Sequence, residues 1–240
     1  CDMAVDNLFI GCSFTAGDGV ENASRFTNLI GDSYNAGLPG TCTIQHFSIA
    51  EDCTRFLKPK NVIFSPYLGC LSRSYLSQRS TYFLSSRHNW YKPYFKNING
   101  EITIKNSPVP YPKIDFENEF KNKKNVYPIN KIFKKIIDKI PLKNKNDLNI
   151  LLKPFNGEDQ LLLCKKLYTD AKKLFPDSKF TLAPIPHYDF LRYSSQYERA
   201  LIKNFFRNLT LEVNYNYIDL ISSLLEENYE NLYYLIDGHF

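Results

Sequence analysis

Short apolar runs that stop at Gly or Pro alternate along this chain with longer amphipathic segments. The runs at 7–11 and 61–64 predict buried strands, because apolar residues follow one another and a Gly or Pro comes soon after each run. Further along, strands and helices are expected in the same rhythm over 158–174, 179–183, 194–208, 215–220 and 221–228. Strands that alternate with helices are typical of a parallel sheet. The pattern predicts an α/β fold, a three-layer α/β/α sandwich with a mostly parallel central sheet.

The sequence also predicts helices and a strand in the remaining segments, some of them more clearly than others. A helix is expected over 21–32, and a second strand either at 45–49 or just before Tyr34. The clearest helix covers 128–140, where Ile and Phe repeat at helical spacing between two prolines. That repeat predicts one apolar face and one solvated face.

One stretch, at about 77–146, breaks the alternation of strands and helices. It contains several prolines, many aromatic residues and the turn sequence Asn-Ile-Asn-Gly at 97–100. A chain of 240 residues fits one domain by the usual size prior. We therefore expect a single domain over 1–240, with an irregular, aromatic-rich insertion that packs on the sandwich.

Composition excludes several classes of protein. The chain is 43% apolar and 23% charged, which excludes a disordered chain and a coiled coil. Its longest apolar runs fall far short of the roughly 18 residues of a membrane span. The net charge of +5 arises from 121–145, where nine lysines and one acid leave the remaining chain net negative. These lysines fit the solvated face of a helix, and we expect no nucleic-acid partner.

The six cysteines and four histidines show no metal-binding spacing. No cysteines are spaced C-x-x-C and no histidines H-x-x-x-H, so we expect neither a metal site nor a cofactor. Scattered cysteines are typical of free thiols in a reducing compartment. We therefore expect a cytoplasmic protein, with a domain of a larger or envelope-associated protein as the alternative.

Two short segments carry candidate chemistry. Ser13 follows the strand at 7–11, at the edge of a parallel sheet where ligands bind. A serine there fits a nucleophile, and it also fits a plain helix N-cap. Near the other end, Asp237 and His239 could orient and supply a general base, although Asp-Gly-His is also an ordinary turn.

Together these segments resemble the SGNH (GDSL-type) hydrolases. Residues 11–17 (Gly-Cys-Ser-Phe-Thr-Ala-Gly) resemble the first sequence block of that family, and 34–40 (Tyr-Asn-Ala-Gly-Leu-Pro-Gly) resemble the second. The Asp-Gly-His segment resembles the fifth, in the right order along the chain. The resemblance implies a flavodoxin-like SGNH fold and a catalytic triad of Ser13, His239 and Asp237. It also implies an oxyanion hole formed by the backbone N–H groups of Ser13 and Gly40.

The chain departs from the family at the third block, which normally supplies an Asn side chain to the oxyanion hole. Counted from the strand at 61–64, that position is Gly69, which has no side chain to donate. We expect Arg73 or a group from the insertion to substitute. His187, after the strand at 179–183, and Trp90, in the insertion, are further candidates for substrate binding.

The sequence therefore predicts a bacterial-type serine esterase acting on an acylated carbohydrate or another small ester. The Asp-x-His spacing is similar to that of O-acetyltransferases that modify cell-surface polysaccharides, which is the alternative activity. Because Gly69 replaces the expected Asn, a catalytically weakened binding domain with the same fold is a third hypothesis. The sequence leaves the oligomeric state open.

Overall fold

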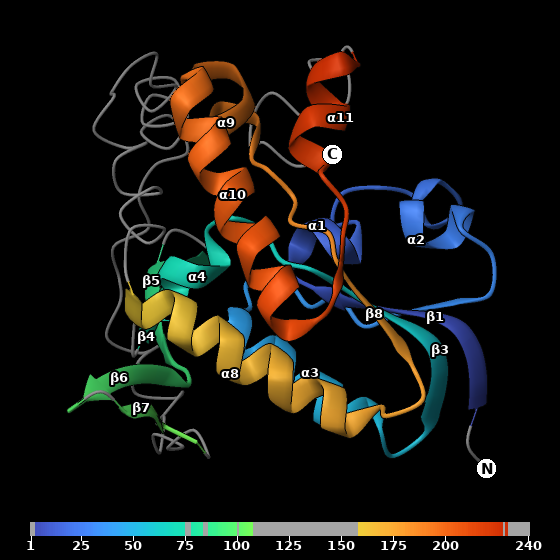
Figure 1. The fold of residues 1–240 in the computed structure, drawn as a ribbon, viewed down its shortest axis with the longest axis horizontal. Coiled ribbons are helices and arrows are strands. Elements are labelled where there is room, and N and C mark those ends of the chain that lie inside the picture. The colour runs from blue at the N-terminus through green and yellow to red at the C-terminus, as the bar shows by residue number, and fades with distance from the viewer. Residues whose placement is uncertain are drawn as a thin grey trace.

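A parallel five-stranded sheet forms the centre of the computed structural model (Figure 1). The structure describes residues 3–74, 78–83, 86–99, 101–107, 158–227 and 229. Its strands lie in the order β2-β1-β3-β8-β9, and each pairs in parallel with its neighbours. Their bounds are β1 (Met3–Gly11), β2 (Ser33–Asn35), β3 (Leu57–Ser65), β8 (Lys179–Leu182) and β9 (Asn216–Tyr217). This is the strand order of flavodoxin-like doubly wound folds, and the predicted α/β class is confirmed.

Helices cover both faces of the sheet, because successive strand residues point to opposite sides. Leu8 and Ile10 are fully buried in the main core, with residues of α3 (Thr43–Cys53), α8 (Glu158–Leu174) and α10 (Gln196–Val213). Phe9, between them, belongs to a second cluster with Phe26 of α2 (Phe26–Leu29) and Leu220 of α11 (Leu220–Glu226). Three layers result, and α3 lies beside α8 (Figure 1).

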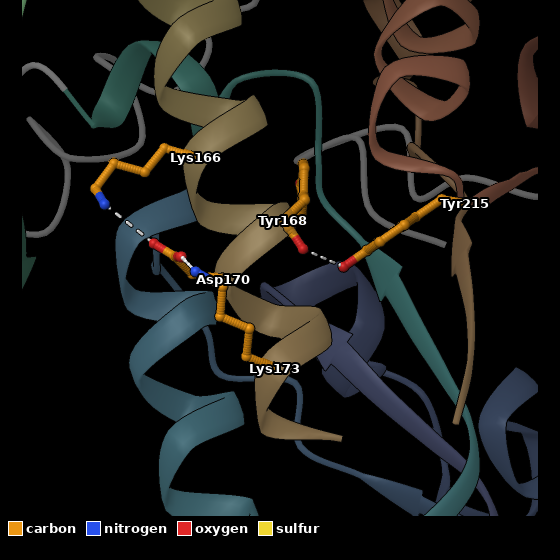
Figure 2. Close-up of polar contacts among 5 residues, drawn as sticks. All are labelled: Lys166, Tyr168, Asp170, Lys173 and Tyr215. Carbon is orange, nitrogen blue, oxygen red and sulfur yellow. Dashed lines mark hydrogen bonds and ion pairs between the residues drawn. The ribbon is translucent and has the colours of Figure 1, made fainter. Parts of the chain in front are cut away.

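The long helix α8 is tied to the last strand of the sheet. The Tyr215 hydroxyl, just before β9, donates a 2.7 Å hydrogen bond to the backbone carbonyl of Tyr168 (Figure 2). On the outer side of α8, Asp170 accepts from Lys166 at 3.0 Å and from Lys173 at 2.7 Å. The hydrogen bond from Lys173 is the main reason why the pKa of Asp170 is lowered. The buried tyrosine pair fixes α8 on the sheet, whereas such exposed ion pairs contribute little.

One early prediction is wrong in detail, and one open alternative is decided. Instead of one helix over 21–32, the chain forms the short helix η1 (Asn22–Ser24) and the single turn α2. Leu29 and Ile30 are 70% and 52% exposed, so the segment has no continuous buried face to support a longer helix. The second strand is β2, just as the Tyr34 alternative predicts, and 45–49 belongs to α3. Gln45 closes a capping box on the Cys42 backbone N–H at 3.2 Å, a helix signal that outweighs the local alternation.

The segment expected to be an irregular insertion contains two antiparallel hairpins in its described part. They are β4 (Gln78–Phe83) with β5 (Ser86–Tyr91), and β6 (Tyr94–Ile98) with β7 (Glu101–Lys105). Asn99 takes a left-handed φ of 54° at the second turn, as an Asn-Gly hairpin requires. Phe95 is buried in a small core shared with Ile44 of α3 and Leu163 of α8. The predicted helix at 128–140 lies outside the described residues, and the predicted domain bounds stay a prediction.

Leu8 of β1 and Leu29 of α2 differ sharply in burial, and this difference predicts different effects on stability. Leu8 is fully buried and Leu29 is 70% exposed. Leu8→Ala should lower the free energy of unfolding by about 2–5 kcal/mol, because it leaves a cavity between the sheet and its helices. Leu29→Ala should change it by less than about 0.5 kcal/mol. Urea unfolding followed by circular dichroism measures both, and equal losses would contradict this description of the core.

Candidate active site

Ser13 lies at the carboxyl edge of the sheet, where β1 turns into a short helix. β1 ends at Gly11, Cys12 is the N-cap, and Ser13 is the first residue of α1 (Ser13–Ala16). The side chain of Ser13 is partly exposed, whereas Cys12 is fully buried. Behind it, the Thr15 hydroxyl donates a buried 2.9 Å hydrogen bond to the carbonyl of Ser65, the last residue of β3. The turn that carries Ser13 is thereby fixed to the neighbouring strand.

The turn at Gly11 has no room for a side chain. A Cβ at this position would lie 2.0 Å from the Thr15 hydroxyl and 2.5 Å from the carbonyl oxygen of Ser65. Any other residue would force α1 away from β3. The glycine of the predicted first block is therefore explained by packing.

The loop at 37–41, which contains the predicted oxyanion donor Gly40 and is called the oxyanion turn below, packs on the backbone at Gly11. The N–H of Leu38 donates to the Gly11 carbonyl at 3.0 Å, and the hydroxyl of Thr41 approaches that carbonyl at 3.4 Å. Gly37 lies against α1 so closely that a Cβ would be 2.4 Å from the backbone nitrogen of Ala16. These contacts hold the loop that contains Gly40 against the turn that contains Ser13.

Gly40 has the backbone conformation that the loop needs. It follows Pro39 in a turn closed by the N–H of Thr41 on the carbonyl of Leu38 at 3.4 Å. Its φ of 79° is left-handed, which fits the third position of a type II turn and favours glycine. None of the described residues accepts a hydrogen bond from the Gly40 N–H, so this group can donate to a ligand, as an oxyanion hole requires.

Asn35 connects the two segments from β2. Its side-chain amide donates to the carbonyl of Thr15 at 2.8 Å and to the hydroxyl of Thr27 at 3.1 Å. Its side-chain oxygen accepts from the N–H of Gly37 at 2.9 Å. One side chain thus fixes α1, the oxyanion turn and α2 relative to one another. In the sequence this residue stands out only as part of the segment at 34–40, and its role was not predicted.

The third-block position is closed by an aromatic ring. A Cβ on Gly69 would lie 2.5 Å from Cε1 of Tyr67, so no asparagine side chain fits there. The Tyr67 ring also stacks on Phe14, the residue after Ser13, with centroids 5.1 Å apart and planes 19° apart. Tyr67 was not among the predicted site residues. The signal that could have indicated Tyr67 is the glycine two residues after it, just beyond the end of β3.

Arg73 lies beside this ring. It is the last residue of α4 (Cys70–Arg73), and its guanidinium carbon lies 5.3 Å from the centroid of Tyr67. The structure therefore places Arg73 next to the ring that packs on the Ser13 turn.

His187 reaches the same ring from the end of β8. It is the N-cap of α9 (Tyr188–Tyr193), and its ring centroid lies 5.7 Å from that of Tyr67 and 6.4 Å from that of Phe14. Its Nδ1 accepts a 3.1 Å hydrogen bond from the backbone N–H of Asp189. A neutral imidazole that accepts through Nδ1 carries its proton on Nε2. In this tautomer His187 can donate a hydrogen bond at Nε2 but cannot act there as a general base.

The structure describes three of the predicted residues only in part or not at all. Asp237 and His239 lie outside the described residues, so the acid and base of the triad stay predictions. Trp90 is placed only through its backbone, in β5 opposite Arg79 of β4. Ser13, Gly40, Arg73 and His187 are thus the predicted residues that the structure positions.

Cys12 is not an alternative nucleophile in this geometry. Its thiol is fully buried and hydrogen-bonded to that of Cys70, which is also fully buried. The hydrogen bond from Cys70 is the main cause that lowers the pKa of Cys12 to about 6, against the opposing effect of burial. Burial is the main cause that raises the pKa of Cys70. The partly exposed neighbour of Cys12 is Ser13, the first residue of α1.

His46 lies beneath the oxyanion turn, on α3. It is fully buried, and its Nε2 lies 3.0 Å from the Thr41 hydroxyl. Burial lowers the pKa of His46 to about 3, and the positive charge of Arg73 adds to this shift. The imidazole is therefore neutral in the folded protein at ordinary pH, and its bond with Thr41 supports the loop that carries Gly40.

Comparisons with known proteins give a structural similarity only. No family model matches the chain, and no curated protein matches its sequence. The structure is similar to that of a variant of esterase AlinE4, with a TM-score of 0.46 and 9% identity over 96% of this chain and 84% of the other. For TesA the TM-score is 0.43 and the identity 10%, over 96% of this chain and 98% of the other. For phospholipase A1 from Streptomyces albidoflavus the TM-score is 0.44 and the identity 8%, over 92% of this chain and 82% of the other.

Two other kinds of site find no support within the described ranges. Among these residues no group of three or more His, Cys, Asp and Glu side chains could hold a metal ion. No helix of the same part of the chain is long and apolar enough to cross a membrane.

The buried neutral His46 predicts a pH-dependent stability. Its pKa is about 3 when folded and 6.5 when unfolded, so its contribution is fully present above pH 6.5 and is lost as the pH falls toward 3. His46→Gln should be less stable than the wild type at pH 7.5. That difference should shrink by about 2 kcal/mol at pH 5.0, because only the wild type must keep this imidazole neutral. Urea unfolding of both proteins at the two pH values measures the change, and a constant difference would show that His46 is not buried in its neutral form.

Proposed function

We propose that this chain is a serine-dependent ester hydrolase, an acyl or acetyl esterase of SGNH type, with Ser13 as its nucleophile. One observation carries the proposal. The carbonyl of Gly11 is the common anchor of the turn that presents Ser13 and of the loop that presents the N–H of Gly40. A partly exposed serine beside an N–H that has no acceptor among the described residues supplies both a nucleophile and an oxyanion donor.

The reaction follows from these groups. The Ser13 oxygen bonds to the ester carbonyl carbon, its proton passes to the His239 imidazole, and the carbonyl π pair moves to oxygen. Asp237 orients that imidazole and stabilises its charged form. When the intermediate collapses, the C–O bond to the leaving alcohol breaks, and the alcohol takes the proton from His239. Water then attacks the acyl-enzyme in the same way, releases the acid and restores Ser13.

The oxyanion is held by backbone donors. The N–H groups of Ser13 and Gly40 are proposed to donate to the oxygen that becomes negative in each tetrahedral intermediate. The left-handed φ of 79° at Gly40 and the contacts of Asn35 fix the loop before substrate binds. Donors that need no rearrangement lower the barrier most effectively.

For the substrate we propose an acylated carbohydrate or another small ester. The two hairpins follow α4 closely along the chain, since Arg73 ends α4 five residues before β4 begins. The ammonium of Lys92, between β5 and β6, donates to the backbone carbonyl of Arg73 and so ties the hairpins back to α4. Trp90 belongs to the β5 strand of this unit, and flat aromatic rings are suited to the apolar faces of sugars.

The nucleophile assignment predicts a loss of turnover in one variant. Ser13→Ala should lower kcat for p-nitrophenyl acetate by at least about 10³-fold, because no acyl-enzyme can form. Release of nitrophenol measures the rate. Ser24→Ala is the matched control, since Ser24 is exposed in η1 and should leave kcat unchanged.

The result that would contradict the proposal is equal nitrophenol release by the wild type and Ser13→Ala. Product analysis with an acetylated oligosaccharide, with and without a sugar acceptor, then separates hydrolysis from transfer. Free acetate alone is the result expected of a hydrolase, and an acetylated acceptor would identify a transferase.

A further inference from the structure

The guanidinium of Arg73 is a partly buried cation without a carboxylate partner among the described residues. Its side chain is partly exposed, and the contact it makes is with the face of Tyr67, 5.3 Å from the ring centroid. Two arginines of α9 and α10 have different partners. Arg192 donates to the Tyr188 hydroxyl at 2.6 Å, and Arg199 donates to the backbone of Leu191 at 2.8 Å. A partly exposed guanidinium with no carboxylate partner among the described residues is suited to bind an anion.

The ring beneath Arg73 is fixed against the Ser13 turn. Tyr67 stacks on Phe14 at 5.1 Å, and the absence of a side chain at Gly69 is what allows the ring to lie there. A cation over an aromatic face is attracted by the ring quadrupole, so the ring also holds the guanidinium. The chain of contacts from Arg73 through Tyr67 to Phe14 ends at the residue next to the nucleophile.

The charge of Arg73 contributes to the lowered pKa values of two buried groups at this edge of the sheet. It adds to the main effect of burial in lowering the pKa of His46, which supports the loop of Gly40 through Thr41. It also contributes, after the stronger hydrogen bond from Cys70, to the lowered pKa of Cys12, the residue before Ser13. The positive field therefore reaches both segments that carry the backbone donors.

We propose that Arg73 stabilises the oxyanion that forms when Ser13 attacks the ester, in the place where a side-chain amide cannot fit. This inference rests on the proposed function. The guanidinium carbon lies 5.3 Å from the centroid of the Tyr67 ring, and this ring takes the space that a side chain at position 69 would need. Tyr67 is then a positioning residue, because it acts through Arg73. The oxyanion forms in the tetrahedral intermediate of every ester substrate. The effect of Arg73 on kcat should therefore not require a charged substrate.

The test uses p-nitrophenyl acetate, a neutral ester. Arg73→Ala should lower kcat by about 10²–10³-fold with KM changed by less than about threefold, because the interaction exists only in the transition state. Added guanidinium chloride at millimolar concentration should restore part of kcat in Arg73→Ala and none in Ser13→Ala. Arg55→Ala is the matched control, since Arg55 is an exposed arginine paired with Asp52 at 3.3 Å, and it should leave kcat unchanged.

A second pair of variants tests the ring. Tyr67→Phe keeps the aromatic face and should retain kcat within about threefold, whereas Tyr67→Leu should lower it toward that of Arg73→Ala. A merely structural role of the ring would lower the melting temperature of Tyr67→Leu without the loss in kcat of the folded fraction, and this result would overturn the positioning role.

The outcomes separate the two proposals. An active wild type and an inactive Ser13→Ala, with Arg73→Ala at full kcat, would overturn the role of Arg73 and leave the esterase proposal standing. A loss confined to KM, seen only with a negatively charged ester, would also overturn it, because Arg73 would then bind the substrate and not the oxyanion. A wild type without Ser13-dependent turnover would overturn both.

Discussion

The carbonyl oxygen of Gly11 is the point on which the rest of the site depends. It accepts from the Leu38 N–H at 3.0 Å, and the Thr41 hydroxyl lies 3.4 Å away. Residue 11 has no side chain, which leaves room for the Thr15 hydroxyl to donate to the carbonyl of Ser65 at 2.9 Å. Three segments far apart in sequence, after β1, β2 and β3, are thereby locked together at one edge of the sheet. In a parallel sheet this is the edge where ligands bind.

From this anchor the chemistry follows in steps. The strand-to-helix turn leaves Ser13 partly exposed while Cys12 next to it is buried, so the turn favours the serine over the thiol as the nucleophile. The left-handed turn at Gly40 belongs to the loop that Leu38 and Thr41 attach to the same strand end. The ring of Tyr67 takes the space of a side chain at position 69, and the guanidinium carbon of Arg73 lies 5.3 Å from the centroid of this ring. The proposed esterase thus combines two backbone donors with one cation.

Much of this arrangement could be predicted from the sequence, because it depends on local signals. The apolar runs that end at Gly or Pro located β1 and β3, and the glycines at 11 and 40 marked the two turns. What could not be predicted depends on contacts between distant segments. The stacking of Tyr67 on Phe14 and the hydrogen bonds of Asn35 join different strands, and neither has a periodic pattern. The helix expected over 21–32 failed because a helix needs a buried face, and the exposed Leu29 and Ile30 do not provide one.

The most direct test of the central claim is to locate the residue that a fluorophosphonate probe modifies, by tandem mass spectrometry of the digested protein. An activated serine displaces fluoride from the phosphorus and keeps the probe as a stable ester. We expect one adduct, with fragment ions that place it on Ser13 and not on the adjacent Cys12. A folded protein that remains unlabelled, or one labelled at another residue with Ser13 unmodified, would contradict it.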